Sequence, residues 1–129
     1  MYCLDTSTII EIFDGVERIK EKLSAINNHH LCINPLVLCE LYKGAMHAKV
    51  TEKRMAFIDA LLQQVDIIEF TEHACKIFAL DYLKLKREGR PVKDVDLMIA
   101  AMCKAHNKIL ITSDKKHFQH ISELRVEVW

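Results

Sequence analysis

The 129-residue chain has little of what marks linkers and membrane spans. It holds only three glycines and two prolines, well separated, so the sequence predicts no flexible linker and no low-complexity tract. No apolar run approaches the roughly 20 residues that span a bilayer, and Asp5 interrupts the stretch where a secretory signal would be apolar. We therefore expect one domain, residues 1–129, located in the cytoplasm and with no membrane partner.

The chain also lacks the spacings of a disulfide or zinc framework. Its five cysteines are an odd number, form no C-x-x-C pair and lie mostly in apolar segments, so we expect buried free thiols. Its seven histidines include no H-E-x-x-H motif and no Cys/His cluster, which argues against zinc.

An excess of charge of either sign is missing as well. The 18 Lys and Arg residues balance the 18 Asp and Glu residues, so no global basic field indicates nucleic-acid binding. Acidic residues gathered at one metal site would leave a basic excess elsewhere, however, so an RNA partner is not excluded.

Short apolar segments alternate with amphipathic ones along the chain. We expect strands at residues 1–4, 31–33, 65–70, 109–111 and 125–128, and helices at residues 6–13, 16–26, 35–47, 51–64, 71–87 and 94–105, with a helical turn at 116–119. Thr6 or Ser7, Thr71 and Asp94 are expected to cap helices. The alternation predicts an α/β fold of three layers, with helices on both faces of a mainly parallel sheet of about five short strands.

Four acidic residues stand beside apolar sequence, where a carboxylate is costly to desolvate. Asp5 ends M-Y-C-L-D, Glu40 lies within L-V-L-C-E-L-Y, Asp96 opens D-L-M-I-A-A-M, and Asp114 follows K-I-L-I-T-S. The carboxyl ends of parallel strands and the helix starts that follow them share one edge of a sheet, so we expect the four acids there. Gathered carboxylates require neutralisation, which Mg²⁺ or Mn²⁺ supplies, and such ions favour phosphodiester hydrolysis.

Each acid alone has a simpler explanation. Asp5 could cap a helix, Asp96 could complement a helix macrodipole, and Asp114 could be a turn residue. Glu40 is harder to explain this way, because its predicted helix offers little solvated surface in the first two turns. The hypothesis depends on the four together.

The order of these motifs resembles the PIN-domain family. The motifs are L-D-T-S at 4–7, C-E-L-Y-K-G at 39–44, D-L-M-I-A-A at 96–101 and I-L-I-T-S-D-K-K-H-F at 109–118. The likeness is greatest to single-domain toxins of the VapC type, which belong to prokaryotic toxin–antitoxin pairs, and it extends over the whole chain.

The resemblance implies a Mg²⁺- or Mn²⁺-dependent endoribonuclease. Asp5 and Asp96 match principal metal ligands, Glu40 a ligand or the group that orients the attacking water, and Asp114 an auxiliary ligand. Ser7 and Thr112 match hydroxyl positions that support the acids. The family often has T-x-N and a further acid before the Phe, whereas this chain has Thr112-Ser113-Asp114 and then His117, so the role of the fourth acid is open.

Substrate and partners are also implied. A basic stretch precedes Asp96 and could guide an RNA backbone, although basic residues also complement a helix C-terminus; it comprises Lys84, Lys86, Arg87, Arg90 and Lys93. The resemblance further implies a homodimer and a small antitoxin whose helix binds near residues 35–64. That region carries more apolar side chains than an outer helical hairpin needs, among them Met46, Met55, Phe57, Ile58, Leu61 and Leu62.

The sequence also bears on three alternative functions. The scaffold could serve as a non-catalytic regulatory or RNA-binding domain, although retention of all four acids counts against this. It could be an RNA-maturation nuclease without a toxin role, which this sequence cannot distinguish. A phosphoacceptor receiver domain would require an aspartate after its third strand, where I-I-E-F offers none.

Overall fold

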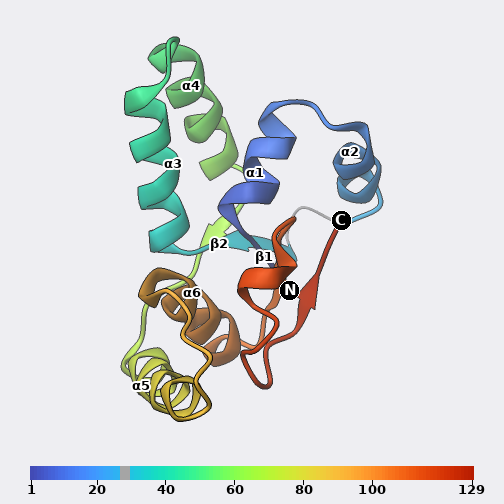
Figure 1. Ribbon diagram of the computed structural model, residues 1–129. Helices are drawn as coiled ribbons and strands as arrows, with labels where there is room; N and C mark the ends of the chain where they lie inside the picture. The colour runs from blue at the N-terminus through green and yellow to red at the C-terminus, as the bar shows by residue number, and fades with distance from the viewer. Residues whose placement is uncertain (27–29) are drawn as a thin grey trace.

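The structure is a computed structural model that describes residues 1–26 and 30–129. Its centre is one five-stranded sheet in the order β3-β2-β1-β4-β5, with every neighbouring pair parallel (Figure 1). The strands are β1 (Tyr2–Leu4), β2 (Leu31–Ile33), β3 (Asp66–Ile67), β4 (Ile109–Ile111) and β5 (Val126–Glu127). The predicted sheet of about five short strands is confirmed.

Helices cover both faces of the sheet, which confirms the three-layer α/β fold. They are α1 (Thr6–Phe13), α2 (Glu17–Ser24), α3 (Pro35–His47), α4 (Thr51–Leu62), α5 (Glu72–Arg87) and α6 (Asp94–Ala105). Figure 1 shows α1 to α4 on one side of the sheet and α5 with α6 on the other. None of these helices is both long and apolar enough to cross a membrane within the described residues.

The core lies against the central strand and α6. Cys3 and Leu4 of β1 are fully buried between β2 and β4, and α6 buries Leu97 and nearly all of Ile99–Cys103. This explains why residues 97–103 are almost uniformly apolar, since a helix buried between a sheet and a second helix has little solvated face. The neighbouring α5 meets α6 through a largely enclosed ion pair, with Lys104 Nζ 2.9 and 3.0 Å from the two carboxylate oxygens of Asp81.

The two edge strands are shorter than predicted. β3 covers Asp66–Ile67 rather than residues 65–70, and β5 covers Val126–Glu127 rather than residues 125–128. Each edge strand has one neighbour, a strand of three residues, so the partner limits the length of the ladder. The helical turn occupies Lys115–His117, one residue earlier than its predicted start.

Two of the predicted helix caps are wrong. Asp5, and neither Thr6 nor Ser7, occupies the N-cap position of α1, and Lys93 rather than Asp94 occupies that of α6. Both N-cap residues have extended backbone and make no side-chain capping bond. The acids that a capping rule would assign to helix ends are therefore available for other contacts.

The cap of α5 is confirmed, and a cap of α3 was missed. The hydroxyl of Thr71 accepts from the backbone N–H of Ala74 at 3.2 Å. Asn34 is fully buried, and its side-chain oxygen accepts from the backbone N–H groups of Leu36 and Val37 at 3.1 and 3.0 Å. It thereby satisfies two of the free N–H groups at the start of α3.

The expectation of five buried thiols is wrong for two of them. Cys3, Cys32 and Cys103 are buried, whereas Cys39 and Cys75 are exposed. Cys39 lies on α3 and Cys75 on α5, where helical periodicity turns these positions towards solvent despite their apolar neighbours in sequence.

Candidate active site

Asp5 is held at the carboxyl end of β1 by hydroxyl groups. The residue is 8 % exposed, and Oδ2 accepts from Thr112 Oγ1 at 2.7 Å and from Ser7 Oγ at 3.3 Å. Its backbone N–H donates to Ile111 O at 2.9 Å, which continues the pairing of β1 with β4. Asp5 therefore occupies the N-cap position of α1 without capping it through its side chain, since its carboxylate accepts from Thr112 at the end of the neighbouring strand.

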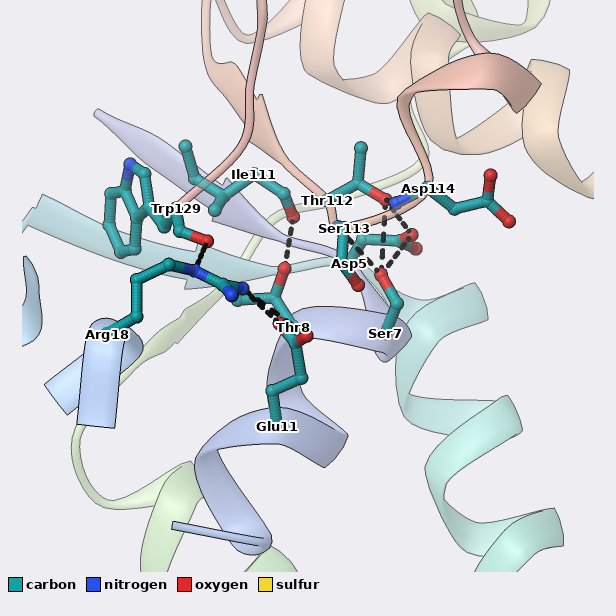
Figure 2. A network of polar contacts seen from close by, with 10 residues as sticks. All are labelled: Asp5, Ser7, Thr8, Glu11, Arg18, Ile111, Thr112, Ser113, Asp114 and Trp129. Carbon is teal, nitrogen blue, oxygen red and sulfur yellow. Dashed lines mark hydrogen bonds and ion pairs between the residues drawn. The ribbon is translucent and has the colours of Figure 1, made fainter. Parts of the chain in front are cut away.

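Thr112 connects both strand ends. It is fully buried, and besides donating to Asp5 its hydroxyl accepts from the backbone N–H of Asp114 at 3.1 Å (Figure 2). The hydroxyls of Ser7 and Thr112 lie 3.1 Å apart, and Ser113 N–H donates to Ser7 Oγ at 3.2 Å. This network fixes Asp5 and the turn that carries Asp114, while the Asp114 carboxylate extends beyond it.

Glu40 reaches the same region from α3. The Thr6 hydroxyl at the start of α1 donates to Glu40 Oε2. Glu40 is exposed, so the expectation that its helix offers little solvated surface there is wrong. The first two turns of α3 bury Val37 and Leu41 in the core on one face, while Glu40 on another face borders the open cleft.

Asp96 and Asp114 face one another across His117. Asp96 lies in the first turn of α6 with its side chain 18 % exposed, and its Oδ2 is 3.7 Å from His117 Nδ1. The opposite ring nitrogen, Nε2, is 3.3 Å from Asp114 Oδ2. An imidazole thus stands between two of the predicted acids, at the position where the resembled family has an acid.

All four acids line one cleft. Its volume is about 620 Å³, and its lining comprises Asp5, Thr6, Ser7, Glu40, Lys43, Gly44, His47, Lys93, Asp94, Val95, Asp96, Asp114 and His117. The predicted residue Thr112 lies beneath this surface, where it supports Asp5. The structure therefore brings the predicted acids together, while their catalytic roles stay a prediction.

The pKa of Asp96 reflects its burial and the negative charge gathered in the cleft. Burial raises the pKa of its carboxyl, as does the nearby negative charge of Asp5 and Glu40, while His117 and Lys93 act in the opposite direction. Two carboxylates from other elements thus lie close enough to Asp96 to disfavour its charge. A cation bound among them would relieve this repulsion.

The donor set consists of hard oxygen ligands, as Mg²⁺ and Mn²⁺ prefer. Within residues 1–26 and 30–129, no three His, Cys, Asp or Glu side chains are already arranged to hold a metal ion. Mg²⁺ commonly binds one or two carboxylates and keeps several waters, so four acids around an open cleft fit its requirements. They do not form a closed structural site.

The predicted basic stretch is mostly elsewhere. Of its five residues only Lys93 lines the cleft. Lys84 donates to Ser122 Oγ at 3.2 Å, and the Lys86 ammonium lies 6.0 Å from the centre of the Tyr82 ring. RNA contact by this stretch stays a prediction.

Among the cleft residues that the sequence did not assign to the site are Thr6, Lys43, His47 and His117. A signal existed for two of them, since Lys43 and His47 follow Glu40 by three and seven residues, which places all three on one helix face. No such local pattern relates Thr6 or His117 to the acids they contact.

A smaller apolar groove adjoins the cleft. It has a volume of about 160 Å³ and lies between α1 and the α3–α4 pair, lined by Thr6, Ile9, Ile10, Phe13, Glu40, Leu41, Gly44, Ala45, Arg54, Phe57 and Ile58. Phe57 and Ile58 belong to the apolar surface predicted to bind a partner, and Met46 of that surface is 64 % exposed. Thr6, Glu40 and Gly44 line both hollows, so the groove opens directly onto the acids.

The fold and the cleft together define the class of protein. It is a parallel α/β domain with an acidic site beyond the carboxyl ends of its strands, which is where such sheets bind ligands. A family model described as the PIN domain matches residues 2–124. The chain belongs to the PIN-domain family, as the sequence motifs predicted.

Named relatives are similar over their whole length. Ribonuclease VapC1 of Haemophilus influenzae strain R2866 is 31 % identical, covering 100 % of this chain and 98 % of its own. The tRNA(fMet)-specific endonuclease VapC of Shigella flexneri is 28 % identical, covering 99 % and 97 %. Among solved structures, the Rickettsia felis VapBC2 complex bound to a promoter DNA fragment matches with a TM-score of 0.92 and 26 % identity, over 99 % of this chain and 98 % of that one. VapBC-1 from nontypeable Haemophilus influenzae matches with a TM-score of 0.89 and 32 % identity, over 99 % and 97 %.

Proposed function

We propose that this protein is a VapC-type endoribonuclease that requires Mg²⁺ or Mn²⁺ and acts as the toxin of a toxin–antitoxin pair in the cytoplasm. The observation that carries the proposal is the meeting of four carboxylates, from β1, α3, α6 and the end of β4, in one open cleft. Its support from relatives is that similar proteins of matching length are named ribonuclease or endonuclease VapC.

Asp5 and Asp96 would hold the cation, with Glu40 and Asp114 as further ligands. When bound, Mg²⁺ or Mn²⁺ would offset the charge of the carboxylates and polarise the scissile phosphate. The protein itself positions these ligands: Ser7 and Thr112 donate to one oxygen of Asp5, and the first turn of α6 presents Asp96 to the cleft.

Glu40 has the freedom to act on the attacking water. It is exposed on α3 and accepts from the Thr6 hydroxyl through Oε2, which leaves Oε1 without a hydrogen-bond donor among the described residues. A carboxylate oxygen facing the cleft can accept a proton from water as that water attacks phosphorus. In-line attack by water would leave a 5′ phosphate on the RNA product.

The partners follow from the same similarity. Solved relatives are described as VapBC complexes, and we propose that this chain likewise binds a small antitoxin, in the apolar groove beside Glu40. An amphipathic helix in that groove would lie beside Glu40 and would block access to the acidic cleft by contact. A homodimer is proposed from the resemblance alone.

The test is cleavage of a mixed RNA pool by purified protein with Mg²⁺ or Mn²⁺, beside an EDTA control. Asp96→Asn should abolish cleavage, whereas Asp59→Asn, an exposed acid on α4 outside the cleft, should leave it unchanged. Mapping of product ends should find 5′ phosphates. Cleavage that persists in Asp96→Asn or in EDTA would reject the metal-dependent mechanism.

Other outcomes separate the remaining functions. Wild-type protein that binds RNA but never cuts it would favour the non-catalytic domain. Cleavage with no growth arrest on expression, and no small neighbouring reading frame whose product blocks the enzyme, would favour an RNA-maturation role.

A further inference from the structure

Three basic side chains line the acidic cleft from the two helices that border it. Lys43 and His47 project from α3, on the same face as Glu40, and Lys93 is the N-cap residue of α6, just before Asp94. All three are exposed. We call Lys43, His47 and Lys93 the basic rim.

The side chains of the basic rim are available to bind a ligand. Among the residues that the structure describes, none of the three side chains makes a hydrogen bond or an ion pair. The Lys93 charge is nevertheless close enough to oppose the rise in the pKa of Asp96. The α5 cations Lys84, Lys86 and Arg87 differ in position, since none of them lines the cleft. Lys84 also donates to Ser122 Oγ, and the Lys86 ammonium lies over the Tyr82 ring.

An acidic cleft alone would repel a polyanion. RNA carries one negative charge on each phosphate, and cations placed beside the acids compensate the repulsion at the point where the scissile bond must lie. Lys43 lies on α3 with Glu40, and Lys93 directly precedes α6, which carries Asp96. All four residues line the same cleft, so an RNA strand bound there can contact both lysines close to the acids.

We propose that the basic rim binds the RNA phosphates that flank the cleaved bond, and that the basic residues outside the cleft do not: Lys84, Lys86 and Arg87 of α5 and Arg90 just after it. This rests on the proposed ribonuclease function and adds to it which residues position the substrate. Lys43 and Lys93 supply the charge, and His47 supplies an imidazole N–H donor further along the same face of α3.

Binding is measured apart from cleavage by fluorescence anisotropy of a labelled single-stranded RNA, with Asp96→Asn protein as the parent so that the RNA stays intact. Titrations at several salt concentrations give the dissociation constant and its salt slope. Removal of one lysine that binds a phosphate of a single strand lowers the slope by about 0.7, which corresponds to about five-fold weaker binding at 0.1 M salt.

Lys43→Gln and Lys93→Gln in that parent should each weaken binding about five-fold and lower the slope, and His47→Ala should weaken it less. The matched controls Lys86→Gln and Arg87→Gln should leave affinity and slope unchanged. All variants should unfold within a degree or so of the parent's temperature, because these side chains are exposed and surface substitutions of this kind change stability little.

Unchanged binding in Lys43→Gln and Lys93→Gln, or equally weakened binding in the α5 controls, would overturn the proposal. Failure of the proposed function looks different, because wild-type protein would then cut no RNA while the rim variants still weakened binding. Wild-type cleavage with rim variants that bind normally would reject the basic rim alone.

Discussion

Asp96 is the acid whose charge the metal-free protein tolerates least. Its folded-state pKa is raised above its usual value of 3.8, first by desolvation and then by Asp5 and Glu40. Between the usual value and the raised one, the folded protein holds a proton that the unfolded chain has released. Stability therefore falls as pH rises through that window and stays reduced above it.

The first prediction follows from that sign. Asp96→Asn removes the charge, so in EDTA at pH 7 the variant should unfold at a higher temperature than the wild type. Thermal unfolding followed across pH checks this, and the difference should vanish below pH 3.8, where Asp96 is protonated in both states. Asp59→Asn should show no such gain, and a lower unfolding temperature for Asp96→Asn at pH 7 would contradict the prediction.

Added Mg²⁺ should reverse the order of the two unfolding temperatures, so that the wild type becomes more stable than Asp96→Asn. A ligand that binds only the folded state raises the unfolding temperature, so the wild type should gain with Mg²⁺ concentration and Asp96→Asn should gain much less. Equal gains in both proteins would mean that the cation binds elsewhere.

Thr112 gives a second prediction at this scale. Thr112→Val keeps the side-chain shape but removes the donor to Asp5 and the acceptor for Asp114 N–H, so we expect a decrease of about 2 kcal/mol in the free energy of unfolding and strongly reduced cleavage. Thr112→Ser keeps the hydroxyl and should retain cleavage. Urea denaturation and the RNA assay measure the two effects, and full activity in Thr112→Val would contradict the role of this hydroxyl.

The predicted acids could be found from sequence because their positions follow from local rules. Asp5 and Asp114 come directly after apolar strand segments, and parallel strands end at one edge. His117 could not be found this way, since its contacts to Asp96 and Asp114 depend on where the turn after β4 falls relative to α6. The exposure of Glu40 was misjudged for a related reason, since an open cleft is not visible in the apolar pattern of one helix.

At the scale of elements, α3 carries a glycine in its interior that packing does not require. A Cβ built at Gly44 meets no heavy atom within 4 Å, so Gly44→Ala should raise the free energy of unfolding by about 0.5–1 kcal/mol through helix propensity. Gly15→Ala is the contrasting control, because φ at Gly15 is +73° and the substitution should destabilise. Chemical denaturation of both variants checks the opposite signs, and a decrease of stability in Gly44→Ala would show a steric demand at that position.

The α5–α6 contact contains the enclosed Lys104–Asp81 pair, with side chains 11 % and 10 % exposed. Lys104→Met leaves the Asp81 carboxylate without its cation and should cost about 3 kcal/mol. The double variant Asp81→Leu/Lys104→Met should recover much of that stability, because neither charge then remains enclosed. A double-mutant cycle in urea tests this, and additive effects of the two substitutions would contradict it.

The boundaries of a helix or strand can be predicted to the residue where the sequence marks them locally, and not where they depend on distant parts of the chain. α3 was bounded correctly because Pro35 suits a first helical position, and β2 and β4 were bounded by their short apolar runs. The edge strands were too long in the prediction because their length is set by a partner strand distant in sequence. The capping role of Asn34 is not evident from the sequence, because an Asn between a buried strand and a proline is equally typical of a turn.

The whole molecule holds its thiols in two environments. Cys39 and Cys75 are exposed, and the other three are buried in the core. We predict that two thiols react rapidly with an aromatic disulfide reagent in the native protein and that three more react only on unfolding. Cys39→Ser/Cys75→Ser protein should show no fast phase, and rapid reaction of all five in the wild type would mean that the core opens under native conditions.

The fold class was predictable from the alternation of strands and helices, because parallel strands need helical crossovers. The order of strands was not, since nothing in β1 alone places it between β2 and β4. That order depends on which packing buries most of the apolar surface, which is a property of the complete chain.

The central position of β1 has a consequence for synthesis. β1 pairs on one side with β4, and Ile109 N–H donates to the backbone carbonyl of Met1 at 3.0 Å, so these two central strands cannot pair until Ile109–Ile111 has been synthesised. Asp5 and Asp114 meet only after that moment. A chain whose translation stops before β4 therefore carries no assembled cleft, so a truncated product of this kind lacks the site that would cut RNA.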